Sequence, residues 1–173
     1  MGIANLIIIG LAIGVGFYVQ TVAGFAAGLF AIPILISVLP LQEAIALMSI
    51  FLLIFSVILV YKNWKKIEQK TVLELSIGVI IGLAIGILIL KTGNPVFLKR
   101  LLGIFTIFFV LYHFLSHKKI KIPGNLGVLF GLAGGFFSGM FSAGGPTYVM
   151  YIYNRIDSAS IFRATIIGIL AVT

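Results

Sequence analysis

The stretch that decides the fold is residues 41–61, which read LQEAIALMSIFLLIFSVILVY. It is apolar over almost its whole length, and about 20 such residues in a helix cross the hydrocarbon core of a bilayer. Residues 72–90 and 98–116 form similar apolar runs. None of these runs shows the alternating polarity of a barrel strand, and an open strand in lipid would leave its backbone unpaired. The sequence therefore predicts an all-α, multi-pass membrane protein.

The composition of the chain agrees with this prediction. Of its 173 residues, 61% are hydrophobic and 9% are charged, whereas about 25% of the residues in a soluble domain are charged. The net charge of +8 comes from short basic clusters between the apolar runs, which is typical of cytoplasmic loops and not of a nucleic-acid groove. We expect a membrane protein whose partners are the lipid bilayer and a small anionic solute, not nucleic acid, with a homo-oligomer as one option.

Two apolar runs are too long for one straight crossing. Residues 3–39 would extend roughly 55 Å as a helix, because each residue adds about 1.5 Å. Residues 125–153 present the same problem. Small and polar residues gather inside each run, in QTVAGFAAG (20–28) and GGFFSGMFSAGGP (134–146). Glycine and proline weaken a helix at such positions, so we expect a broken or re-entrant helical segment in each run.

The two long runs resemble each other. GFAAGLFA (24–31) aligns with GFFSGMFS (135–142), and a second register aligns GFY (16–18) with GFF (135–137). Both registers give a repeat of about 110–120 residues, and both remain open at this point. The sequence thus predicts two related copies of one transmembrane unit.

The repeat divides the chain and bears on its orientation. We assign residues 1–120 to a first transmembrane repeat and residues 121–173 to the start of a second, incomplete one, because two full copies need roughly 220–240 residues. The lysines of loops 62–70 and 117–123 indicate that both loops face the cytoplasm. If residues 3–39 form a hairpin the copies are inverted, and if they cross once the copies are parallel. We favour inverted copies.

The interrupted segments are the first candidate for a binding site. A helix that restarts inside the membrane exposes backbone N–H groups, which attract anions together with the helix dipole. Glycine lets a substrate oxygen approach the backbone, and neutral polar side chains add further donors. Paired interruptions in two halves of a chain are typical of transporter binding sites. The candidate substrate-binding residues are Gln20, Thr21, Gly24, Ser138, Ser142, Gly144, Gly145 and Pro146.

Charged residues at the edges of the apolar runs give two more candidates. Arg163 lies near the start of the last run, and a guanidinium can bind an oxyanion through two parallel hydrogen bonds. An arginine that snorkels to the membrane interface is the alternative. Glu43 begins a predicted helix, where a carboxylate complements the helix dipole. In a sharper interpretation it couples transport to protons or pairs with Arg163.

Other classes of function fit the sequence less well. His113 and His117 share a predicted helix face, but no carboxylate accompanies them as in a metal-dependent hydrolase. Cysteine is absent, and no nucleotide-phosphate loop occurs. We therefore expect no enzyme, no metal and no cofactor. The alternative to a transporter is a membrane scaffold or assembly subunit whose glycine-rich segments only pack helices.

Four segments resemble a known family. Residues 134–146, followed by YIYNR (151–155) and FRAT (162–165), resemble the second-half signature of the TauE/SafE sulfite exporter family, also called the toluene sulfonate uptake permease family. Residues 20–33 resemble its first-half signature, although the usual glycine run is thinned to FAA at 25–27. The resemblance covers nearly the whole chain. It implies a cytoplasmic-membrane exporter or permease for sulfite, sulfonates or related anions. Such a transporter would hold its substrate where the two broken segments meet.

Overall fold

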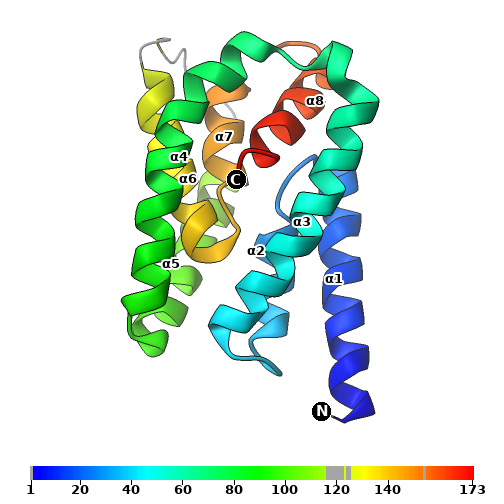
Figure 1. Cartoon of the computed structure of the whole chain (residues 1–173), viewed down its shortest axis with the longest axis vertical. Coiled ribbons are helices and arrows are strands. Elements are labelled where there is room, and N and C mark those ends of the chain that lie inside the picture. The colour runs from blue at the N-terminus through cyan, green and yellow to red at the C-terminus, as the bar shows by residue number, and fades with distance from the viewer. Residues whose placement is uncertain (1, 116–122, 124–125, 154) are drawn as a thin grey trace.

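A computed structural model describes residues 2–115, 123, 126–153 and 155–173. Every regular element among these residues is a helix, which confirms the all-α prediction for the described part of the chain. Figure 1 shows the helices side by side, with the N-terminus at one end. The elements are α1 (Ile3–Ala23), α2 (Ala27–Leu35), α3 (Leu41–Asn63), the short 3₁₀ helix η1 (Trp64–Lys66), α4 (Gln69–Thr92), α5 (Pro95–Leu115), α6 (Gly127–Phe141), α7 (Gly145–Ile152) and α8 (Ala159–Leu170).

Within the described part of the chain, three helical stretches are long and apolar enough to cross a membrane: Ile3–Val22, Leu41–Lys66 and Gln69–Thr92. Large apolar side chains such as Ile58 and Ile81 remain exposed on these helices. An apolar surface of this extent is unsuited to water but matches the interior of a bilayer. Two further apolar helices, α6 and α8, are shorter. The described residues therefore form the helices of a multi-pass membrane protein.

The most extensive helix contact in the described residues joins α4 and α6 through glycines. A β-carbon at Gly82 would collide with the carbonyl oxygen of Leu132, and one at Gly135 would collide with that of Val79. Small residues at every fourth position let two membrane helices approach backbone to backbone. The glycines in this contact are Gly78, Gly82 and Gly86 on α4, with Gly131, Gly135 and Gly139 on α6.

The first long run folds into a helical hairpin. Helix α1 ends at Ala23, and α2 begins at Ala27 after a linker in which Gly24 and Ala26 have φ angles of +87° and +81°. Helix α2 then returns along α1, so that Gly16 packs directly against Ala27. Figure 1 shows α1 rising from the N-terminus and α2 running back beside it. The linker needs the left-handed conformation twice, once at glycine and once at alanine.

The second long run also reverses, but later than its first glycines suggest. Helix α6 continues through Gly134 and Gly135 to Phe141, and Ser142 adopts the left-handed conformation with φ +49°. Helix α7 then packs back on α6, where the ring of Tyr148 covers Gly134. The glycine pair in α6 therefore serves close packing, on Tyr148 and on α4, instead of ending the helix.

A polar cluster ties the second hairpin to α4. The Arg155 guanidinium lies 2.6 Å from the Glu74 carboxylate, which also accepts a hydrogen bond of 2.8 Å from the Tyr151 hydroxyl. The same guanidinium lies 4.5 Å above the centre of the Tyr151 ring. Because both charged side chains are about three-quarters buried, the cluster anchors the end of α7 against the first turns of α4.

The glycine contact gives a first prediction. Gly82→Ala should destabilise the protein by about 1–3 kcal/mol, because the added methyl group meets backbone atoms that cannot turn aside. A β-carbon at Gly14 would meet nothing within 4 Å. Gly14→Ala is therefore the matched control, and it should hold or raise the melting temperature through helix propensity. Thermal unfolding in detergent measures both variants, and equal melting temperatures would contradict the close contact.

The left-handed alanine gives a second prediction. A non-glycine residue pays about 1–2 kcal/mol for this conformation, so Ala26→Gly should raise the melting temperature despite the greater flexibility of the unfolded chain. Ala12→Gly, in the buried interior of α1, should lower it, since glycine is unfavourable within a helix. A fall in the melting temperature of Ala26→Gly would show that Ala26 is not strained.

Candidate functional site

The linkers of the two hairpins lie in direct contact. The main chain of Ser142, at the end of α6, packs against Gly28 in the first turn of α2. In return, the Phe25 side chain packs against Gly145 at the start of α7, where a β-carbon would lie 3.0 Å from the Phe25 β-carbon. Each short helix therefore begins beside the linker of the other hairpin. The two segments singled out from the sequence meet in space, and this contact is closely packed.

A cavity of about 560 Å³ lies beside this contact, between α1, α3 and α8. We call it the arginine cavity. Its volume is within the range of small-molecule sites, about 300–1,000 Å³. Among the described residues that line it, Arg163 carries a formal positive charge and the others are neutral. The lining residues are Gln20, Thr21, Gly24, Phe55, Leu59, Asn63, Ala159, Ser160, Arg163, Ala164 and Ile167.

The Arg163 side chain enters this cavity from the second turn of α8. Its aliphatic stem packs over Gly24, so the positive φ at Gly24 brings the α1 linker directly under the arginine. No described residue forms an ion pair or hydrogen bond with the guanidinium. Arg163 is exposed in this chain, so its five donors are available to a ligand.

The first turn of α8 forms part of the wall of the same cavity. Ala159 and Ser160, its first residues, are part of the wall, and Ser158 provides no side-chain cap. The first N–H groups of a helix have no acceptor within it, and they mark the positive end of the helix dipole. The helix terminus and the Arg163 guanidinium therefore favour negative charge in the same place.

Gln20 is an unusual part of the cavity wall. It is 3% exposed, and both its amide nitrogen and its amide oxygen are buried without a hydrogen-bond partner. A buried polar group left unpaired costs about 1–3 kcal/mol, so such groups are rare in folded proteins. The neighbouring Thr21 is different, because its hydroxyl donates to the Phe17 carbonyl oxygen at 2.8 Å.

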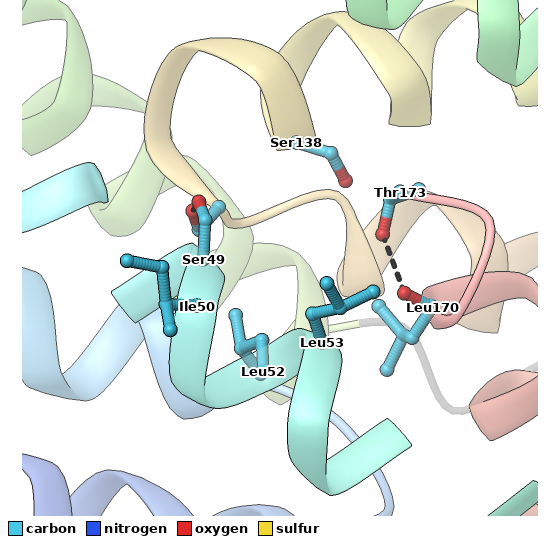
Figure 2. A pocket seen from close by; sticks show the side chains of 8 residues that line it. Ser49, Ile50, Leu52, Leu53, Ser138, Leu170 and Thr173 are labelled. Carbon is cyan, nitrogen blue, oxygen red and sulfur yellow. Dashed lines mark hydrogen bonds between the residues drawn. The ribbon is translucent and has the colours of Figure 1, made fainter. Parts of the chain in front are cut away.

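A smaller cavity of about 250 Å³ lies farther along α3 and α8, and we call it the serine cavity. The hydroxyl oxygens of Ser49 and Ser142 are 2.8 Å apart, which joins α3 to the end of α6. Figure 2 shows Ser138 and Thr173 across the cavity from the apolar α3 side chains, with the Thr173 hydroxyl donating to Leu170 at 2.9 Å. The lining residues are Ser49, Ile50, Leu52, Leu53, Ser138, Ser142, Leu170 and Thr173.

The candidate residues from the sequence divide among three places. Four of them line the arginine cavity, two line the serine cavity, and three at the start of α7 line neither cavity. The β-carbon that Gly144 lacks would collide with Ser138 and with the main chain of α6, so Gly144 has a packing role. The three groups are Gln20, Thr21, Gly24 and Arg163, then Ser138 and Ser142, then Gly144, Gly145 and Pro146.

The proposed pairing of Glu43 with Arg163 does not occur. Glu43 lies exposed in the first turn of α3, whereas Asn63 at the other end of this helix lines the arginine cavity. Twenty residues of helix separate the two ends by about 30 Å. The Glu43 carboxylate instead lies where a helix dipole favours negative charge.

Other polar wall residues were missed by the sequence analysis. Asn63 and Ser160 line the arginine cavity, and Ser49 and Thr173 line the serine cavity. Asn63 donates to the Leu59 carbonyl oxygen at 3.0 Å, which leaves its amide oxygen free to accept. In the sequence, Asn63 lies in the basic loop 62–70 and Ser160 lies near the start of the last apolar run. Neither position by itself indicates a ligand. The side chains of His113 and His117 lie outside the described residues.

Comparisons with known proteins agree with the membrane architecture. The family model described as "Sulfite exporter TauE/SafE" matches residues 6–173. The chain is 26% identical over 168 residues to the probable sulfite/organosulfonate exporter TauE of Cupriavidus necator, an alignment that covers 93% of this chain and 66% of the relative. No solved structure matches the chain. Since the family model covers nearly all of the sequence, the chain belongs to the TauE/SafE sulfite exporter family.

Proposed function

We propose that this protein is a secondary transporter of small sulfur-containing anions, such as sulfite or organosulfonates, and that the anion binds in the arginine cavity. The observation that carries the proposal is the convergence of three features on one cavity: the Arg163 guanidinium, the open N-terminus of α8 and the unpaired amide of Gln20. The family and the name of the relative from Cupriavidus necator support the class of substrate.

The position of the anion in this proposal is refined by the packing of the two linkers. From the sequence, we expected N–H groups of the restarted helices to hold the substrate. The starts of α2 and α7 instead pack against Ser142 and Phe25. We therefore place the substrate beside the meeting point of the two hairpins, where α8 supplies the free N–H groups and Gly24 forms the floor.

We also propose that the two hairpins are inverted repeats. Helices α1 and α6 end 118 positions apart, at Ala23 and Phe141, and each is followed by a left-handed residue. The same spacing relates Gln20 to Ser138, and these two residues line the arginine cavity and the serine cavity, respectively. This spacing is close to the second of the two sequence registers. In Figure 1 the α1–α2 and α6–α7 hairpins extend in from opposite ends of the molecule.

We also propose that the two cavities are parts of one alternating-access pathway. Both cavities lie between α3 and α8, one near Asn63 and the other near Ser49. A transporter whose two halves rock about a central site exposes that site first to one side and then to the other. We propose that the boundary between α3 and α8 is the path along which the anion passes.

The membrane placement remains part of the proposal too. The lysines near η1 would face the cytoplasm of a cytoplasmic-membrane protein, which places the N-terminus outside. The proposed boundary between the repeats, at residues 120 and 121, lies outside the described residues. The glycines of α4 and α6 do pack helices, as the scaffold hypothesis requires. That hypothesis gives no role to a charged cavity, so we favour transport.

Arg163 provides the test of this function. Arg163→Ala should reduce the uptake of sulfite into liposomes that contain the purified protein by at least about 10-fold, because a charge-assisted, two-pronged contact is lost. It should also abolish the thermal stabilisation that sulfite gives the protein in detergent. Arg100→Ala removes the same charge from an exposed position on α5 that lines neither cavity.

Two outcomes would contradict the proposed site. If Arg163→Ala and Arg100→Ala transport sulfite at the same rate, then Arg163 does not hold the anion. If sulfate, thiosulfate, taurine and sulfite all leave the melting temperature of the unmodified protein unchanged, the arginine cavity is not an anion site. A normal melting temperature of Arg163→Ala without ligand is the control for folding.

A further inference from the structure

The polar wall of the arginine cavity presents acceptors as well as donors. Arg163 and the first N–H groups of α8 can only donate hydrogen bonds. Gln20 belongs to the wall, and its amide oxygen and nitrogen are both buried behind the cavity surface without a hydrogen-bond partner. Asn63 donates to Leu59 and Thr21 donates to Phe17, so each keeps an oxygen that can accept. A ligand that satisfies this wall must therefore carry a donor of its own.

The charge of the wall sets a second requirement. Among the described lining residues, Arg163 supplies the formal positive charge and none is a carboxylate. A monoanion balances this charge, whereas a dianion would leave an uncompensated negative charge in a membrane protein, where isolated charge is expensive. Fully deprotonated sulfate and sulfite have only acceptor oxygens. They would place these oxygens against the lone pairs of the Gln20 amide oxygen.

We propose that Gln20 is a specificity-determining residue that selects monoanions bearing a hydrogen-bond donor, such as hydroxy-substituted sulfonates, over dianions. This inference rests on the proposed transport function and deepens it. When the Gln20 side chain turns toward the cavity, its amide nitrogen donates to an oxygen of the sulfonate group, and its amide oxygen accepts from the hydroxyl group. The apolar walls at Phe55, Leu59 and Ile167 accommodate the carbon atoms between these groups. Both unpaired atoms of the buried amide are then satisfied by one ligand.

Two pairs of probe ligands test this selection at one pH. Ethanesulfonate and 2-hydroxyethanesulfonate differ by a hydroxyl donor, and methanesulfonate and sulfate share a tetrahedral shape but differ in charge. Dissociation constants come from the thermal stabilisation of the purified protein at increasing ligand concentration. We expect 2-hydroxyethanesulfonate to bind about 3- to 10-fold more tightly than ethanesulfonate, because it forms one additional neutral hydrogen bond. Methanesulfonate should bind at least about 10-fold more tightly than sulfate.

The variant Gln20→Leu should remove the preference for the hydroxylated sulfonate while the protein still binds ethanesulfonate. Gln42→Leu is the matched control, because Gln42 is on α3 and lines neither cavity. It should keep the preference.

The measurements on the unmodified protein decide the matter even if Gln20→Leu fails to fold. Equal affinities within both ligand pairs would overturn the inference, and so would a preference that survives in Gln20→Leu. The proposed function would still stand in either case if Arg163→Ala abolished binding of all four probes. If none of the four probes and no sulfite stabilised the unmodified protein, both the inference and the proposed function would fall.

Discussion

The backbone contact between α4 and α6 is the constraint on which the other features depend. Helices in lipid gain little from the hydrophobic effect when they associate, so close packing of small residues has to hold them together. The glycines of α4 and α6 provide this packing, and the stacked rings of Phe105 and Phe137, 4.0 Å apart, add α5 to the pair. Once α6 is fixed in this way, its end determines where Ser142 lies, and Ser142 in turn supports the start of α2.

The candidate site shows how a membrane protein can attract an anion with little buried charge. A helix terminus supplies positive potential from backbone dipoles, which carry no ionisable group and need no counter-ion. In the site that we propose, α8 would supply that potential, and the guanidinium of Arg163 would add a two-pronged contact to the anion. The left-handed turn at Gly24 contributes by bringing the end of α1 beneath the arginine. The left-handed turn at Gly24 and the charge of Arg163 therefore shape the same part of the cavity.

The class of fold could be predicted from the sequence because the bilayer leaves few choices: apolar stretches of the length of 41–61 must be helices there. The roles of individual glycines were harder to assign, since glycine both weakens a helix and allows close packing. The four-residue spacing of Gly131, Gly135 and Gly139 was visible in the sequence and indicates packing, yet Gly135 and Gly139 were assigned to an interruption. The meeting of Gln20 with Arg163 could not be derived, because more than a hundred residues separate them and only tertiary structure brings α8 beside α1.

The uneven packing of the molecule has a consequence for its motion. Along α4 and α6 the two backbones interlock, so these helices must move as one rigid body and take α7 with them through the Glu74–Arg155 anchor. Along α3 and α8, by contrast, two cavities interrupt the packing. The contact between α3 and α8 is therefore more deformable than the contact between α4 and α6. A tilt of α8 against α3 would separate no pair of close-packed glycines.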